Sequence, residues 1–139
     1  MVPRIETLPW RHVLTVPAIG PAVRMARETA ELALTEWGVS LRHPTVGPAL
    51  LILSELVTNS VRHAADRSPD ITVIYAGSVD TLAFAVHDHH PYRPPLHEAG
   101  TGTGGLGTVM ELTLRLGGTA VTRPDADGTG KSIWITLPL

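Results

Sequence analysis

The stretch Leu50–Ala64, LLILSELVTNSVRHA, decides the fold, because it has the pattern of a helix with two different faces. At about 100° per residue, one side of this helix is apolar. That side carries Leu50, Leu53, Val57, Val61 and Ala64. Glu55, Asn59 and Arg62 gather within a sector of roughly 60° on the other side. A carboxylate and a carboxamide one turn apart must meet water, a neighbouring loop or a ligand. The helix alone leaves these interpretations open.

The composition indicates one ordinary globular domain. The chain has 139 residues and a mass of 14.8 kDa, of which 43% are apolar and 17% charged. A net charge of −2 gives no electrostatic footprint for nucleic acid or for an acidic membrane surface. The absence of cysteine excludes disulfides, thiolate metal sites and a cysteine nucleophile.

The chain shows no targeting or membrane segment. Its N-terminus lacks the continuous apolar core of a signal peptide, and no apolar run approaches the roughly 20 residues that cross a bilayer. No internal repeat and no long linker divides it. We therefore expect residues 1–139 to form one cytoplasmic domain that binds neither membranes nor nucleic acid.

The order of helical and strand patterns predicts the fold class. The expected elements are a strand at 10–16, helices from Pro21 to Trp37 and from Thr45 to Ala65, strands at 71–75 and 82–86, a helix from Leu106 to Leu116, and strands at 119–123 and 132–137. The strands arrive mostly in adjacent pairs, whereas the helices arrive separately. This order favours an α+β two-layer sandwich, with a mostly antiparallel mixed sheet and the helices on one face.

Asp88 directly follows a strand of apolar residues and precedes a proline-rich loop. A carboxylate at this strand end is placed to accept a hydrogen bond from an exocyclic amino group in a pocket. The commoner role of aspartate at such a position is to cap a turn. Both interpretations stay open on this residue alone.

The segment GTGTGGLG, from Gly100 to Gly107, is a candidate phosphate site. It matches G-x-G-x-x-G at Gly100, Gly102 and Gly105, but it follows a loop instead of a strand, so the dinucleotide fingerprint lacks its context. A glycine loop that leads into a helix N-terminus still offers unblocked N–H groups and the positive end of a dipole. The alternative is a merely mobile surface loop.

The segment GTGKS at residues 128–132 invites comparison with a Walker A motif. That motif requires a glycine five positions before Gly130, where this chain has Asp125, and it requires a following helix. A strand is expected here instead, so we reject the motif.

Several potential metal ligands lie close together after the third strand. They are His87, Asp88, His89, His90, His97 and Glu98. His87 and His89 would share one side of an extended strand, and imidazole with carboxylate suits zinc. Pro91 interrupts the strand at once, and no partner cluster of recognised spacing appears elsewhere. We therefore expect exposed loop histidines instead of a metal site at this cluster.

Four pieces of the chain, in this order, resemble the ATP-binding domain shared by DNA gyrase, heat-shock chaperones, histidine kinases and mismatch-repair proteins, the GHKL superfamily. ELVTNSVRHA resembles its N box, DHHP stands where its first glycine box belongs, GGLGTV where its second belongs, and GKSIWITLP resembles its last strand. The match runs from the strand near His12 to Pro138. Within the superfamily the chain looks like the small, stand-alone anti-sigma factors that are also serine protein kinases.

The resemblance implies roles for the polar side of the helix. Asn59 would hold the Mg²⁺ ion that bridges the ATP phosphates, and Glu55 would be the general base. Arg62 would sit near the phosphates, where a cation helps to offset their charge. One helical turn sets Glu55 and Asn59 about 6 Å apart at Cβ.

The resemblance also assigns the base and the phosphate lid. Asp88 would receive the adenine amino group, and Ser132 would stand where the family usually has a threonine beside the adenine. The lid would be lined by Gly102, Gly105, Leu106 and Gly107. Two departures stand out: His90 replaces the glycine of the first glycine box, and Thr103 with Gly104 occupies places where glycine and a polar or basic residue are usual.

The resemblance implies an ATP-dependent serine/threonine protein kinase that phosphorylates an anti-sigma factor antagonist and inhibits a sigma factor. A homodimer follows from the resemblance only, and no sensor or phospho-accepting histidine domain can be fitted into 139 residues. His90 motivates one alternative, a nucleotide-dependent binding module with little or no catalysis. An interaction domain that has lost nucleotide is the other alternative.

Overall fold

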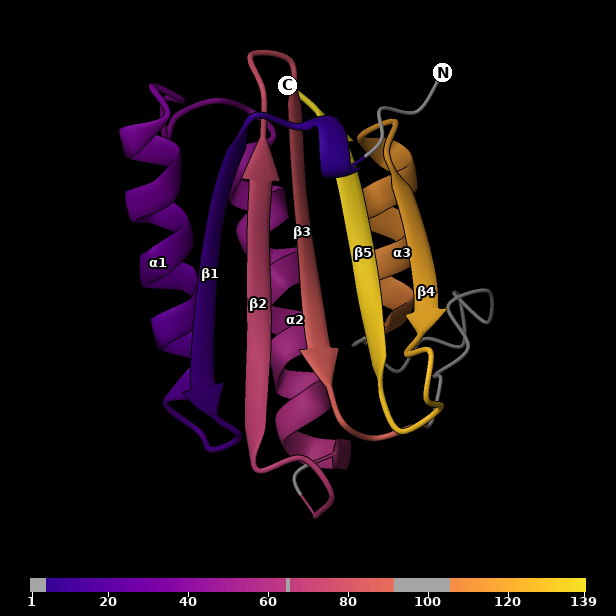
Figure 1. Ribbon diagram of the computed structural model, residues 1–139. Coiled ribbons are helices and arrows are strands. Elements are labelled where there is room, and N and C mark those ends of the chain that lie inside the picture. Colours follow the sequence, from indigo (N-terminus) through magenta and orange to yellow (C-terminus); the bar gives the residue numbers. More distant parts are fainter. Residues whose placement is uncertain (1–4, 65, 92–105) are drawn as a thin grey trace.

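The structure, a computed structural model, describes residues 5–64, 66–91 and 106–139. Its central element is a five-stranded antiparallel sheet. Its elements are η1 (Ile5–Thr7), β1 (Trp10–Pro17), α1 (Ala22–Glu36), α2 (Val46–Ala64), β2 (Asp70–Gly77), β3 (Thr81–Asp88), α3 (Leu106–Arg115), β4 (Thr119–Pro124) and β5 (Lys131–Pro138). The strand order is β1-β2-β3-β5-β4, so β5 lies between β3 and β4 (Figure 1).

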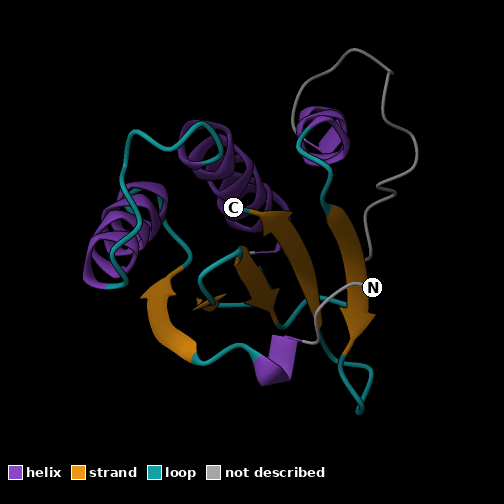
Figure 2. Cartoon of the chain, turned by 90° about the horizontal axis from the view of Figure 1, so that it is seen from above, coloured by secondary structure: helices purple, strands orange, loops and turns teal. Residues whose placement is uncertain are grey.

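The three α-helices cover one face of this sheet, and the short helix η1 lies on the other (Figure 2). The predicted α+β two-layer sandwich is therefore confirmed. Each pairing between described strands is antiparallel, so the parallel component of the expected mixed sheet is not found among them. The short N-terminal helix was not predicted; Ile5 packs beneath the sheet with Ala76 and Ala83.

Strand alternation separates two sides of the sheet. Ile133, Ile135 and Leu137 of β5 are buried in the main core beneath the helices. Trp134 points to the opposite side, where it packs against the small cluster around Ile5. The side chains of β3 alternate in the same way, so only residues two apart along this strand face the same side of the sheet.

Helix α2 is buried on most of its sides. Ile52, Leu53, Leu56 and Val57 are each at most 1% exposed, because α1, α3 and the sheet surround this helix. Leu50 and Val61, which were expected in the buried face, are only partly buried. The expected end at residue 65 lies outside the described residues, and the last helical residue is Ala64.

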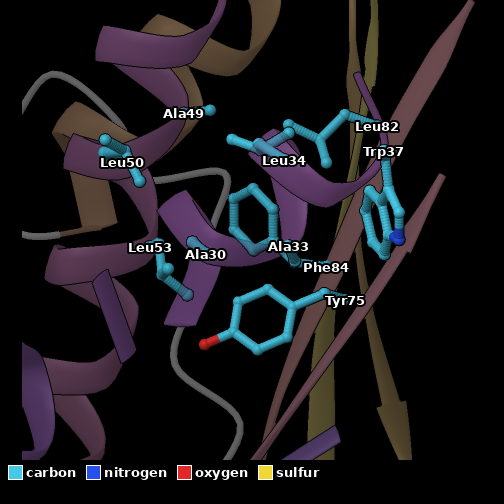
Figure 3. A pocket seen from close by; sticks show the side chains of 10 residues that line it. All are labelled: Ala30, Ala33, Leu34, Trp37, Ala49, Leu50, Leu53, Tyr75, Leu82 and Phe84. Carbon is cyan, nitrogen blue, oxygen red and sulfur yellow. The ribbon is translucent and has the colours of Figure 1, made fainter. Parts of the chain in front are cut away.

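An apolar pocket lies between α1, the first half of α2 and the sheet (Figure 3). Its lining residues are Ala30, Ala33, Leu34, Trp37, Ala49, Leu50, Leu53, Tyr75, Leu82 and Phe84. The Tyr75 hydroxyl donates a 2.7 Å hydrogen bond to the carbonyl oxygen of Ala26, and burial raises the pKa of Tyr75 above its ordinary value. No charged side chain lines this pocket, so it offers no chemistry for a phosphate or a metal ion.

Candidate functional site

The candidate site lies where the C-terminal end of β3 meets the second half of α2. Asp88 is the last residue of β3, and its side chain is almost completely buried against the helix layer. The hydroxyl of Ser60 on α2 donates a 2.8 Å hydrogen bond to Asp88 Oδ2. This bond joins the helix that carries Glu55 and Asn59 to the strand end that carries the carboxylate.

Lys131 forms an ion pair with Asp88. Its Nζ lies 2.7 Å from Asp88 Oδ1, and the two side chains are only 6% and 2% exposed. The two residues are direct partners in the antiparallel pairing of β3 with β5, so both side chains point to the same face. A buried carboxylate is costly unless it is paired, and here Lys131 neutralises its charge.

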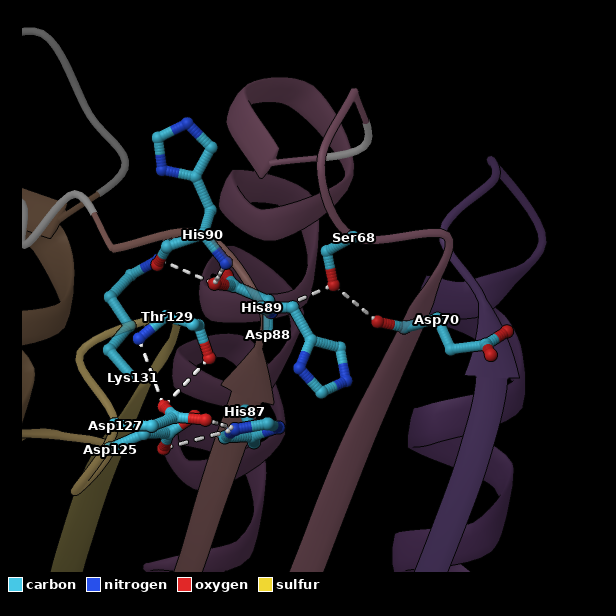
Figure 4. A network of polar contacts seen from close by, with 10 residues as sticks. All are labelled: Ser68, Asp70, His87, Asp88, His89, His90, Asp125, Asp127, Thr129 and Lys131. Atoms are coloured by element: carbon cyan, nitrogen blue, oxygen red, sulfur yellow. Dashed lines mark hydrogen bonds and ion pairs between the residues drawn. The ribbon is translucent and has the colours of Figure 1, made fainter.

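The backbone after β3 completes the surroundings of this pair (Figure 4). The N–H of His90 donates to Asp88 Oδ1 at 3.0 Å, and Lys131 Nζ also donates to the His90 carbonyl at 3.1 Å. An ionised carboxylate offers about four acceptor positions. The ammonium, the His90 N–H and the Ser60 hydroxyl use three of them.

The predicted phosphate end of the site looks different. Glu55 and Asn59 are half-buried on α2, and Arg62 is exposed one turn further on. Among the residues that the structure describes, no hydrogen bond or ion pair engages any of these three side chains. They lie on the helix that also supplies Ser60, next to Asp88, so the predicted groups are brought to one region and their polar atoms remain available.

The structure corrects the expected position of Ser132. This residue pairs with His87 in the β3–β5 register and shares the sheet face of Trp134, opposite the helices. Its neighbour Lys131 takes the position beside Asp88 instead. The physical reason is the period of two along β5, which sends consecutive side chains to opposite faces.

The structure describes only part of the predicted phosphate lid. Gly102 and Gly105 lie outside the described residues, as do Thr103 and Gly104. Leu106 and Gly107 open α3, and both are half-buried. A helix N-terminus presents N–H groups without intrahelical partners and a partial positive charge, and the phosphate role of this segment stays a prediction.

Sequence reasoning missed Ser60 and Lys131. Ser60 follows Leu53 and Val57 at helical spacing, so its hydroxyl had to be buried and bonded. Lys131 is in phase with Ile133 and Ile135, which marked it as a helix-facing cation in need of an acid.

A sequence profile described as "Histidine kinase-, DNA gyrase B-, and HSP90-like ATPase" matches residues 47–139, about two thirds of the chain. The chain belongs to this family. The match begins at the start of α2 and includes Asp88 and β5, so every described candidate residue lies within it. Membership in this ATPase family implies a nucleotide-binding domain, and the predicted GHKL superfamily is confirmed.

A solved structure supports the same assignment for the fold. The histidine kinase domain from the Erythrobacter litoralis EL346 blue-light activated histidine kinase matches with a TM-score of 0.51 and 27% sequence identity. The match covers 68% of this chain and 45% of that one, so the chain spans less than half of the histidine kinase domain. No protein with a curated description matches the chain. Within the described ranges, no helix combines the length and apolarity that crossing a bilayer requires.

Proposed function

We propose that this histidine kinase-like ATPase domain is an anti-sigma factor with serine protein kinase activity. It would transfer the γ-phosphoryl group of ATP to a serine of an antagonist protein and would inhibit a sigma factor by binding it. The observation that carries the catalytic part is the pair Glu55 and Asn59, one helical turn apart, half-buried and without described partners. The regulatory part rests on the resemblance of the sequence boxes.

The residues at this end fit a magnesium-bound triphosphate. A carboxamide oxygen is a suitable Mg²⁺ ligand, and Mg²⁺ keeps several waters and takes phosphate oxygens, so Asn59 alone is a sufficient protein contribution. Arg62 adds a positive charge within one turn of Asn59, on the same polar sector. Bound Mg²⁺ would offset the charge of the phosphates.

Glu55 would serve the acceptor hydroxyl. Its carboxylate would take the proton of the serine hydroxyl while the serine oxygen forms a bond to the γ-phosphorus and the bond to the bridging oxygen of ADP breaks. Phosphoryl transfer depends mainly on positioning and charge neutralisation, so Glu55, Asn59 and the N-terminus of α3 form an adequate set.

The base end of the site favours a second candidate function. Lys131 already donates to Asp88, the carboxylate that would receive the exocyclic amino group of adenine. An adenine must therefore use the remaining acceptor position of Asp88 or displace the ammonium. This observation supports a nucleotide-dependent binding module with little or no catalysis, in which weak base recognition slows or prevents turnover.

The catalytic hypothesis is tested by two variants and one control. Partner proteins are captured from cell extract with the purified chain, and serine phosphorylation by added Mg·ATP is measured by mass spectrometry. Glu55→Ala should abolish phosphoryl transfer but keep ATP binding, and Asn59→Ala should abolish both. Glu28→Ala, which removes an exposed acid of α1, is the matched control and should behave as wild type. Unchanged phosphorylation in either site variant contradicts the kinase hypothesis.

Calorimetric titration separates the two functions. Mg·ATP, Mg·ADP and metal-free ATP are titrated into the wild-type chain and into Asn59→Ala. The kinase hypothesis requires magnesium-dependent ATP binding that Asn59→Ala removes, together with transfer to the captured partner. Binding of the same kind without transfer favours the binding module. A complete lack of nucleotide binding contradicts both functions. In that case nucleotide would also leave the free energy of unfolding unchanged, whereas a ligand at 100 times its Kd should raise it by about 2.7 kcal/mol.

A further inference from the structure

Three side chains of types that can bind a metal ion meet on the sheet face opposite the candidate nucleotide site. His87, His89 and Asp125 each offer one ligand atom, and these atoms all lie within 4.8 Å of one another. His87 Nε2 lies 2.9 Å from Asp125 Oδ2 and 3.2 Å from Oδ1, and the two imidazole rings are 5.0 Å apart in an edge-to-face arrangement. Figure 4 shows the His87 ring directed at the Asp125 carboxylate.

The fold holds the carboxylate against the strand end. Asp125 begins the turn between β4 and β5, where its N–H donates to the Gly130 carbonyl at 2.9 Å and its own carbonyl accepts from Gly128 at 3.0 Å. A Cβ at position 130 would lie 2.6 Å from Asp125 Oδ2 and 2.9 Å from the Cα of His89. Glycine at position 130 is therefore what lets the turn approach the histidines so closely.

The second histidine is also fixed through its backbone. The N–H of His89 donates a 2.9 Å hydrogen bond to the hydroxyl of Ser68, which itself donates to the Asp70 carbonyl at 2.6 Å. The backbone positions of all three ligands are thus set by the strand end and by two hydrogen-bonded turns.

We propose that His87, His89 and Asp125 bind a first-row transition-metal ion of the Zn²⁺ class. Two imidazoles and one carboxylate form an established donor set for such ions, whereas Mg²⁺ and Ca²⁺ prefer oxygen ligands alone. His87 and Asp125 are 21% and 28% exposed, so the site is shielded on the sheet side and open on the solvent side. Three protein ligands leave a fourth position for water or another ligand.

The surrounding charge favours a cation. Asp127 lies in the same turn as Asp125, where its Oδ1 accepts hydrogen bonds from the N–H and the hydroxyl of Thr129 at 3.0 and 2.7 Å. Asp88 lies between the two histidines in sequence but points to the other face, so it stays with Lys131 and does not join the site.

The test is a calorimetric titration of tag-free, chelator-stripped protein with ZnCl₂ and, separately, with MgCl₂. We expect one Zn²⁺ per chain and no Mg²⁺ binding that depends on these residues. His87→Ala, His89→Ala and Asp125→Asn should each weaken Zn²⁺ binding at least tenfold. His12→Ala, which removes an exposed histidine of β1, is the matched control and should leave the affinity unchanged.

A second measurement uses Co²⁺ in place of Zn²⁺. The visible absorption of bound Co²⁺ reports the coordination geometry directly. The wild-type spectrum should be lost in His89→Ala. Because His89 is exposed, the far-UV circular dichroism of this variant should match that of wild type. Absence of saturable one-to-one Zn²⁺ binding overturns the proposal. Equal Zn²⁺ affinity in wild type, His87→Ala and Asp125→Asn also overturns it.

Discussion

The two ends of the candidate nucleotide site differ in how far their polar groups are already bonded. At the base end, Asp88 is buried and accepts from Ser60, Lys131 and the His90 backbone. At the phosphate end, Glu55 and Asn59 have no partner among the described residues and remain half-exposed. Both ends were predicted as ligand contacts from the same source, the resemblance to the boxes of the GHKL superfamily.

This difference separates stability from ligand binding within one site. A buried group with three internal bonds contributes to the folded state and costs free energy when it is released. A half-exposed group without internal bonds contributes little to the stability of the fold, and all of its polar atoms can bind a ligand. The following predictions test this separation.

The largest expected effect is at Asp88. Asp88→Ala leaves the Lys131 ammonium buried without its counter-ion, which should lower the free energy of unfolding by about 3–5 kcal/mol. The measurement is urea denaturation followed by circular dichroism. The double variant Asp88→Leu with Lys131→Met should recover much of the loss, because an apolar pair needs no counter-ion. If Asp88→Ala lowers the free energy of unfolding by less than about 1 kcal/mol, the base end does not contribute more to stability than the phosphate end.

The next effect concerns nucleotide affinity at the same place. Lys131→Met removes the ammonium and frees an acceptor position on Asp88, so the affinity for Mg·ATP should rise about tenfold, equivalent to about 1.4 kcal/mol. Lys131→Arg keeps the charge and serves as the control without a gain. The affinity is measured by calorimetric titration at low temperature, on variants that circular dichroism shows to be folded. Equal affinity in the two variants would show that the ion pair does not restrict the base.

A smaller effect is expected at Tyr75, a buried neutral group outside both ends. Tyr75→Phe removes the hydrogen bond to Ala26 and should cost about 1 kcal/mol, without changing nucleotide or zinc affinity. Because burial raises the pKa of Tyr75, its stabilising contribution is complete below the unfolded value of about 10 and is lost as the pH rises further. As the pH rises above 10, the free energy of unfolding should therefore fall more for wild type than for Tyr75→Phe, as measured by denaturation. Parallel curves would contradict this.

The smallest effect on stability is expected at the phosphate end. Glu55→Gln and Asn59→Ala should each change the free energy of unfolding by no more than about 0.5 kcal/mol, since neither side chain has an internal bond to lose. The same urea denaturation measures this. A loss as large as that of Asp88→Ala would mean that the two ends do not differ in kind.

Local pattern was enough to predict most of the fold. The predicted strand at 10–16 differs from β1 by one residue, and Gly38 ends the first helix as expected, with a φ of 77° that favours glycine. The period of two in 71–75 and 82–86 predicted the β2–β3 hairpin. These features depend on residues close in sequence, where propensity and turn chemistry decide the outcome.

The site was predicted less completely, because its contacts join distant parts of the chain. The last strand was expected to start at Ser132, one residue late, and this hid the common phase of Lys131 with Ile133. Asp125 lies 38 residues from His87, so the histidines alone gave no sign of their third neighbour. Pairing register brings these groups together, and register is a property of the assembled sheet.

The position of β5 has a consequence for the order of folding. Among the described strands β4 pairs only with β5, although β4 comes first along the chain. The described strand partner of β4 therefore becomes available only when residues 131–138 have been added to the chain. A chain that stops before Lys131 would therefore lose two strands of the sheet instead of one, because β4 has no other strand partner among the described residues.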